Sequence, residues 1–391
     1  MNVRKAPLEG ITVIDLTRVL AGPYLTMMMA DMGARVIKIE MPDKGDDARH
    51  FGPFLNGESA YFATINRGKE SISLNLKDKT DLDILEKLMK KADVLVENFR
   101  AGTLDRLGYD WETLQAINPK LICAAVSGFG QTGPYSDRPA YDLVVQGMGG
   151  VMSLTGDDDS EKPIRVGTSI GDITAGMFGL SGVLAALYDR EITGKGVKVD
   201  VGMLDCQVAI LENAVSRYFA ENVVPGPMGL RHPSITPFAG LRAKNDEYVI
   251  LAAGNDGMFK NLCKALERPD LLEDERFESN ADRTNNYQAL YGELEKTLGN
   301  REVSDWLEIL QSAGIPSGPI NNIEQVVNDP HIRARNMIVT AQNEDGTEFR
   351  MPGNPVKFSG YDDPPTRRAA PRHDQNREAI LNEIFGDIAE D

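Results

Sequence analysis

The sequence has few of the residues that build disulfide frameworks and metal sites. Its 391 residues include three cysteines with no CxxC pair and four histidines with no HExxH or other ligand spacing. These residues are Cys123, Cys206, Cys263, His50, His232, His331 and His373. The pattern argues against a disulfide scaffold, a zinc ribbon or a thioredoxin motif, and it favours a reducing cytoplasm. We therefore expect no metal site.

Long hydrophobic runs are also missing. We find no apolar run that approaches the ~20 residues of a membrane-spanning helix. The N-terminal MNVRKAPLEG contains no apolar signal-peptide core. Hydrophobic residues make up 41% of the chain and charged residues 26%, values that are typical of a soluble globular protein. We expect a cytoplasmic protein without a membrane partner.

Positive charge is scarce. The chain has 42 Lys and Arg against 59 Asp and Glu, which gives a net charge of −17. A nucleic-acid partner is therefore not expected, because polyanion binding requires a basic excess. Residues 1–110 carry 16 basic and 17 acidic residues, whereas the remainder carries 26 and 42. An acidic solubilising surface explains the second part, and the near-neutral first part is compatible with an anionic ligand.

Several catalytic motifs are absent as well. The sequence has neither a GxSxG nucleophile elbow nor a GxxxxGK[ST] phosphate loop. The first turn between a strand and a helix reads LAGPY rather than GxGxxG, so the dinucleotide fingerprint of nicotinamide and flavin enzymes is missing.

The pattern that is present alternates short strands with helices. Strand-like runs lie at 11–16, 34–40, 71–76, 92–99, 120–129 and 197–204, and helical segments follow most of them. Amphipathic or apolar helices are expected at 20–34, 79–91, 109–117, 172–193 and 205–221. This alternation predicts the α/β class, with a doubly wound, mostly parallel, Rossmann-like sheet.

The chain divides into three parts. Residues 1–222 are predicted to form a large domain, and 223–325 a smaller inserted α+β domain that opens with four prolines in its first 15 residues. The small domain is expected to hold a hairpin at 239–254 and helices at 255–267, 286–298 and 302–314. Residues 326–391 include a β-like segment with an Asp-Gly turn at 336–353 and a final helix at 378–385, and are predicted to return to the large domain.

Asp172 is the acidic residue whose position suggests chemistry. It lies between Gly171 and a long, almost uncharged helical run. The structural interpretation makes it the N-cap of a buried helix. The functional interpretation makes it a nucleophile, because the helix N-terminus stabilises a carboxylate and the neighbouring glycine allows close approach. These residues alone leave both interpretations open.

Eight ordered stretches resemble the family III CoA-transferases, which include formyl-CoA and carnitine CoA-transferases and the α-methylacyl-CoA racemases. The stretches are DLTRVLAGP (15–23), GARVIKIE (33–40), NRGKESISLNLK (66–77), ADVLVENFRAGTLDRLG (92–108), SGFGQTGPYSDRPAYD (127–142), GDITAGMFG (171–179), GKGVKVDVGMLD (194–205) and DPHIRARNM (329–337). They cover most of the large domain, whereas the small domain matches loosely. The resemblance implies an interlocked homodimer with acyl-CoA and a small carboxylic acid as substrates.

The resemblance also implies the mechanism. The family's catalytic aspartate falls on Asp172, which would attack the acyl-CoA thioester to give a mixed anhydride and then an aspartyl-CoA thioester. Racemases of the family resemble Gly-His-Asp at the position where this chain has Ala140, Tyr141 and Asp142. A phenol with an ordinary pKa of about 10 replaces imidazole poorly as a base near neutral pH. A CoA-transferase is therefore expected, with an isomerase as the alternative.

The CoA-contacting positions are carried over from the same resemblance. They are Leu20, Ala21, Leu74, Asn75, Lys77, Asn98, Phe99, Arg100, Arg106, Arg138, Ala140 and Tyr141. The cations among them suit the phosphates of CoA. Where some members have an arginine after KIE, this chain has Met41. The polyglycine loop typical of oxalate-using members is not visible, which argues against oxalate, and Arg231 or His232 is a candidate partner for a second carboxylate.

Overall fold

The computed structural model describes residues 5–158 and 162–386, which form two compact units. The first unit contains residues 5–152, 165–223 and 330–386. The second contains 153–158, 162–164 and 224–329. The domain boundaries at 222 and 325 stay predictions.

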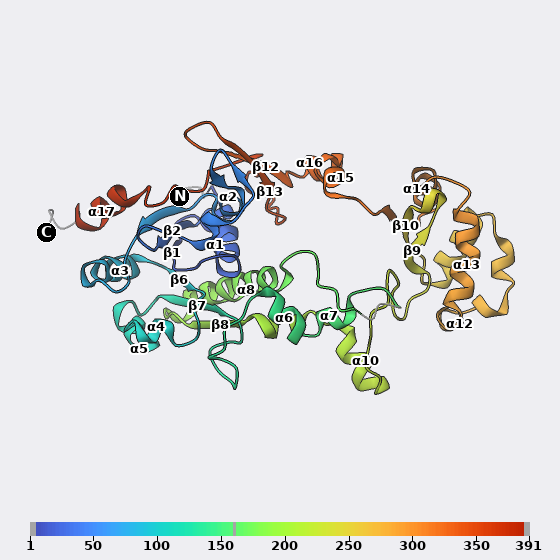
Figure 1. Cartoon of the computed structure of the whole chain (residues 1–391), viewed down its shortest axis with the longest axis horizontal. Coiled ribbons are helices and arrows are strands. Elements are labelled where there is room, and N and C mark those ends of the chain that lie inside the picture. Colours follow the sequence, from blue (N-terminus) through green and yellow to red (C-terminus); the bar gives the residue numbers. More distant parts are fainter. Residues whose placement is uncertain (1–4, 159–161, 387–391) are drawn as a thin grey trace. The chain divides into compact units, whose positions relative to one another are not determined.

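A six-stranded sheet forms the centre of the first unit (Figure 1). Its strands are β1 (Thr12–Asp15), β2 (Arg35–Glu40), β5 (Glu70–Ser73), β6 (Val94–Glu97), β7 (Ile122–Ser127) and β8 (Lys198–Gly202). They are arranged in the order β5-β2-β1-β6-β7-β8, and every neighbouring pair is parallel. The predicted α/β class with a doubly wound parallel sheet is thus confirmed. The strand order reverses between β1 and β6, where ligands bind in folds of this type.

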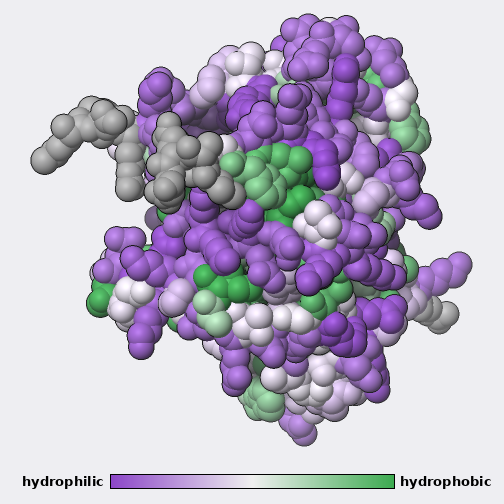
Figure 2. Space-filling view, turned by 90° about the vertical axis from the view of Figure 1, so that its left-hand side faces the viewer, coloured by the Kyte–Doolittle hydropathy of each residue, from purple (hydrophilic) through white to green (hydrophobic). Residues whose placement is uncertain are grey.

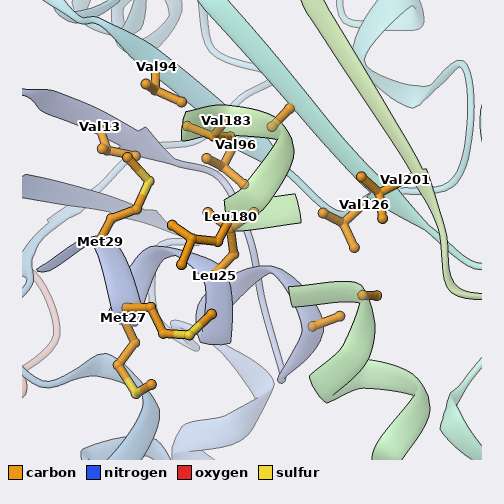
Figure 3. Close-up of a cluster of buried hydrophobic side chains, with 14 of the residues drawn as sticks. Val13, Leu25, Met27, Met29, Val94, Val96, Val126, Leu180, Val183 and Val201 are labelled. Carbon is orange, nitrogen blue, oxygen red and sulfur yellow. The ribbon is translucent and has the colours of Figure 1, made fainter. Parts of the chain in front are cut away.

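Alternate residues along each strand fill two hydrophobic layers. Val13, Val94 and Val96 pack on one face with helices α1 (Ala21–Asp31) and α8 (Ile170–Thr193), as Figure 3 shows. Ile14 and Leu95 point to the other face, which α3 (Lys79–Lys91), α5 (Trp111–Ile117) and α17 (Arg377–Gly386) cover. Burial of both faces explains why the strands read as nearly continuous apolar runs.

Glycines on α8 let it approach α1 closely. A Cβ at Gly176 would lie 2.9 Å from the carbonyl oxygen of Ala21, and one at Gly179 would lie 2.6 Å from Cδ1 of Leu25. By length and composition α8 is also apolar enough to cross a membrane, contrary to the expectation that no such run exists. Half of its apolar stretch is buried inside the structure, however, and a core helix passes the same test.

Two further details differ from the sequence prediction. The helix expected over 205–221 is two helices, α9 (Met203–Ala209) and α10 (Asn213–Glu221). They are separated at Glu212, whose positive φ of 50° interrupts the helical backbone. The elements that were not predicted include four short helices and a small hairpin in the first part of the chain. These are α2 (Ala60–Asn66), α4 (Thr103–Arg106), α6 (Asp142–Met148), α7 (Val151–Leu154), β3 (Phe54–Leu55) and β4 (Glu58–Ser59).

The second unit has its own sheet and core. Strands β9 (Phe238–Arg242) and β10 (Tyr248–Ala252) form the predicted hairpin, and β11 (Ser317–Pro319) completes an antiparallel sheet. The sheet packs with helices through residues such as Leu251, Phe259, Leu290 and Trp306. The helices of this unit are α11 (Asp256–Ala265), α12 (Asn280–Asn285), α13 (Tyr287–Leu298), α14 (Val303–Ser312) and α15 (Ile323–Asn328).

The C-terminal part of the chain completes the first unit. Strands β12 (Ile338–Gln342), β13 (Glu348–Pro352) and β14 (Thr366–Arg367) form a third sheet after the short helix α16 (Pro330–Ala334). Residues 371–377 then run along the outer edge of β5. Asn376 accepts from the Ser71 amide at 3.0 Å and donates its own amide to the Ser71 carbonyl at 2.9 Å. Asp374 accepts from the Ser73 amide at 2.6 Å.

Figure 2 shows one face that is mainly hydrophilic, with small hydrophobic patches between the polar side chains.

Candidate active site

A cavity of about 160 Å³ lies where the strand order reverses. Loops that follow β1, β6 and β7 line it, together with the start of α8. We call it the Asp172 cavity. Its lining residues are Arg18, Val19, Leu20, Ala21, Asp47, Asn98, Phe99, Arg100, Ala101, Val126, Ser127, Gly128, Ser136, Arg138, Pro139, Ala140, Tyr141, Asp172 and Met203.

Asp172 is the third residue of α8 and is partly buried. The N-cap is Ser169, so the interpretation of Asp172 as the helix cap is wrong. Burial, together with the neighbouring Asp142 carboxylate, raises the pKa of Asp172 from 3.8 to about 7. These two effects outweigh the stabilisation of the anion that a helix N-terminus provides. A carboxylate of this basicity is a stronger nucleophile than an ordinary aspartate.

Asp142 fixes the backbone in front of Asp172. Its Oδ1 accepts from the Gly171 amide at 2.8 Å, and its Oδ2 accepts from Nε2 of Gln146, also at 2.8 Å. The side-chain oxygen of Gln146 in turn accepts from the Val166 amide at 3.0 Å. Asp142 therefore satisfies an amide in the first turn of α8 and holds that turn against α6.

A second cavity of about 530 Å³ adjoins the first. Arg18 and Phe99 line both cavities. The remaining lining residues are Leu16, Thr17, Ile39, Glu40, Met41, Pro42, Gly45, Asp46, Leu74, Asn75, Leu76, Lys77, Thr103 and Leu107. An elongated ligand with an anionic middle suits two adjoining cavities that share an arginine.

The structure brings most of the predicted site residues to these two cavities. Leu20, Ala21, Asn98, Phe99, Arg100, Arg138, Ala140 and Tyr141 line the Asp172 cavity, and Leu74, Asn75, Lys77 and Phe99 line the second. Met41, which replaces the arginine of some family members, lines the second cavity. Arg106 lines neither cavity and donates from Nη2 to Oγ1 of Thr103 at 2.8 Å.

Several lining residues were not predicted from the sequence, among them Arg18, Ser127 and Met203. Arg18 lies in the loop after β1, Ser127 ends β7, and Met203 follows β8. Their place at the carboxyl ends of the strands was the available signal, because in parallel sheets the ligand lies at that edge. Arg18 adds a cation to those of Arg100, Arg138 and Lys77.

Arg231 and His232 have partners within the second unit. Arg231 Nε lies 3.3 Å from Oδ2 of Asp158, and its guanidinium carbon is 4.2 Å from the centre of the Tyr287 ring. His232 stacks on Phe238 with a ring separation of 5.4 Å. Among residues 5–158 and 162–386, no group of three or more His, Cys, Asp or Glu side chains is placed to hold a metal ion.

Comparisons with known proteins found a family model, relatives and solved structures that match the chain. Residues 8–377 match the model of CoA-transferase family III. The chain is 47% identical to the acetyl-CoA:oxalate CoA-transferase of Acetobacter aceti, covering 97% of this chain and 96% of the relative. It is 38% identical to the succinate–glutarate CoA-transferase of Agrobacterium fabrum, covering 98% and 97%. The crystal structure of a CAIB/BAIF family protein from Brucella suis matches with a TM-score of 0.84 and 38% identity, covering 97% of this chain and 100% of that one.

Proposed function

The chain belongs to CoA-transferase family III, and from this premise we propose that it moves CoA from an acyl-CoA donor to a free carboxylic acid through covalent intermediates on Asp172. The observation that carries this proposal is the partly buried, basic carboxylate of Asp172 in a cavity at the reversal point of the sheet. Exchange of a thioester between two carboxylic acids is nearly thermoneutral, so the reaction requires positioning rather than an energy source.

The proposed reaction has four steps, each breaking one bond as another forms. The Asp172 carboxylate attacks the donor thioester and expels the CoA thiolate, which gives a mixed anhydride. The thiolate attacks the aspartyl carbonyl and expels the donor acid, leaving an aspartyl-CoA thioester. The acceptor carboxylate then attacks this thioester and releases the thiolate. Finally the thiolate attacks the acceptor carbonyl, which frees the new acyl-CoA and regenerates Asp172.

The surrounding residues support these steps. The first turn of α1 lines the same cavity as Asp172 through Leu20 and Ala21. Amides at a helix N-terminus stabilise the oxyanions that form at each attack. Arg18, Arg100 and Arg138 line the cavity and supply positive charge for the CoA phosphates.

We propose a small dicarboxylic acid as the acceptor. The two relatives named above carry oxalate, succinate and glutarate in their names, and all three are dicarboxylates. The missing polyglycine loop argues against oxalate, whereas the relative at 47% identity is named for it. Oxalate therefore belongs in the acceptor panel with its longer homologues.

An isomerase of branched acyl-CoAs is not favoured. The relatives are named as CoA-transferases, and Tyr141 occupies the position of the racemase imidazole.

Self-association and location stay predictions. An interlocked homodimer would cover the large apolar side chains exposed on the first unit, including Met177, Phe178, Tyr188 and Phe219. A cytoplasmic location is expected from the low cysteine content.

An acyl exchange assay tests the proposed function. The protein is incubated with acetyl-CoA or succinyl-CoA and a panel of free mono- and dicarboxylic acids, and new CoA thioesters are identified by mass spectrometry. We expect transfer to a dicarboxylate, with loss of transfer but not of CoA binding in Asp172→Ala. Transfer that survives in Asp172→Ala would contradict the assigned nucleophile. Deuterium entering the α-position of a branched acyl-CoA, without transfer, would favour the isomerase.

A further inference from the structure

The turn from Thr17 to Val19 separates the two cavities. Thr17 lines the second cavity, Val19 lines the Asp172 cavity, and Arg18 lines both. The turn leads directly into α1, whose first residues line the Asp172 cavity. Val19 has a φ of +67°, in the left-handed region that β-branched residues rarely adopt. A residue in this conformation persists when its surroundings hold it there.

Side chains from neighbouring strand ends bind the backbone of this turn. Asp15 accepts from the Thr17 amide at 2.9 Å, and Nζ of Lys38 donates to the Thr17 carbonyl at 2.7 Å. The amide group of Asn98 accepts from the Arg18 amide at 2.9 Å and donates to the Arg18 carbonyl at 2.7 Å. Asp46 accepts from the Val19 amide at 3.0 Å. Five backbone groups in three residues are thus held by side chains.

The Asp46–Lys38 pair lies inside the protein. Lys38 Nζ is 2.8 Å from Oδ2 of Asp46, and the two side chains are 0% and 1% exposed. Burial works to lower the pKa of Lys38, but the carboxylates of Asp15, Asp46 and Glu40 outweigh burial and raise it. Lys38 therefore stays charged and keeps its donors for Thr17 and Asp46.

A buried ion pair contributes little stability relative to apolar side chains of the same volume. The pair in this position instead does something that apolar side chains cannot do: it presents an acceptor to the Val19 amide and a donor to the Thr17 carbonyl. Both groups belong to the turn that sets where α1 begins.

We propose that Asp46, held by Lys38, is a positioning residue that keeps Val19 left-handed and so aligns the first turn of α1 with the thioester at Asp172. This inference rests on the proposed function. A displacement of a positioned group by about 1 Å is enough to slow a reaction roughly 100-fold. Asp46 lines the second cavity but does not contact the reacting atoms in this assignment.

The test compares three variants by their kcat, their KM for acyl-CoA and their Tm. For Asp46→Ala we expect kcat to fall roughly 30- to 100-fold, with KM changing by less than about threefold. Adding Val19→Gly is expected to restore about tenfold of that loss, because glycine adopts a positive φ without being held there. If Asp46→Ala does not fold, Asp46→Asn replaces it, since asparagine keeps an acceptor for Val19 and should show a smaller loss of kcat.

The matched control is Asp31→Ala. It breaks the Arg67–Asp31 pair, whose side chains are 2% and 3% exposed and line neither cavity. We expect its Tm to fall as in Asp46→Ala while kcat stays within about twofold of wild type. Equal kcat values for the two variants, or no rescue by Val19→Gly, would overturn the positioning role. Retained transfer in Asp172→Ala would instead overturn the proposed function, so the two failures are distinguishable.

Discussion

The amide of Gly171 donates to Oδ1 of Asp142 at 2.8 Å, which places a second carboxylate beside Asp172. The same side chain therefore has two effects. Its hydrogen bond fixes the first turn of α8, and its negative charge helps to raise the pKa of Asp172 to about 7. The nucleophile is held in place and made more basic by one neighbour.

Removal of the Asp142 charge should shift the pH dependence of transfer. Asp172 attacks as a carboxylate, so kcat/KM of the wild type rises with pH through about 7. In Asp142→Asn the repulsion between the two carboxylates is lost, so the pKa of Asp172 falls. The acidic limb of the pH profile, where kcat/KM rises with pH, then moves to lower pH. The pKa does not return to 3.8, because burial is the larger cause of the shift. The control Asp189→Asn lies in the last part of α8 and should leave the limb unchanged. A limb that stays in place in Asp142→Asn would contradict the coupling.

Replacement of Asp172 should make the protein more stable at alkaline pH. The folded-state pKa of about 7 lies above the ordinary value of 3.8, so the folded state holds the proton more tightly than the unfolded state. The free energy of unfolding therefore falls as pH rises between these values, by roughly 1.4 kcal/mol per unit at most. Asp172→Asn has no titrating carboxyl group at this position, so its free energy of unfolding does not fall with pH for this reason. Urea unfolding should show the variant gaining stability over wild type between pH 5 and pH 8. A difference that is independent of pH would argue against the raised pKa.

The close contacts around Gly171 predict that this position does not tolerate a side chain larger than hydrogen. A Cβ there would lie 2.7 Å from Cγ2 of Val145 and 3.0 Å from Oδ1 of Asp142. Gly171→Ala should destabilise the fold by about 1–3 kcal/mol and lower kcat, since the start of α8 must move away from Asp142. Gly167→Ala is the matched change, because a Cβ at Gly167 meets nothing within 4 Å. Chemical unfolding and steady-state kinetics measure both effects, and equal behaviour of the two variants would contradict the steric reason.

Arg18 should contribute to acyl-CoA binding although the family resemblance did not assign it. It lines both cavities, where the phosphates of CoA are expected. Arg18→Ala removes a charge-assisted hydrogen bond, so KM for acyl-CoA should rise roughly 10- to 100-fold at low salt and less in concentrated salt. Lys195→Ala removes a cation that lies just before β8, at the amino-terminal ends of the strands and away from both cavities. This variant should leave KM unchanged. Similar salt-dependent increases in both variants would indicate a general charge effect.

The fold was largely predictable from local patterns, whereas the site geometry was not. All six strands of the large sheet were expected, because burial on both faces makes most of them short apolar runs. The region of Asp172 was found from its glycine and the helix after it, and its role came from the resemblance. The raised pKa was not predictable, since it depends on burial and on Asp142, 30 residues away in the sequence.

The same limit applies to the turn that separates the cavities. No local feature of Lys38 in ARVIKIE shows that its amine reaches back to the carbonyl of Thr17, because that contact depends on the pairing of β1 with β2. The break in the helix expected over 205–221 was not predictable either. The composition of this segment favours a helix throughout, and it does not show that the backbone of Glu212 adopts a positive φ.

The run of residues 371–377 along β5 has a consequence for how the protein is made. The edge of β5 receives its partners from a segment about 300 residues later in the chain, through Asn376 and Asp374. During synthesis this strand edge therefore stays open until residues 371–377 have left the ribosome. An open edge is a template for pairing with other chains. A nascent chain stalled before residue 371 should consequently be more prone to aggregation than the finished enzyme, and more dependent on chaperones.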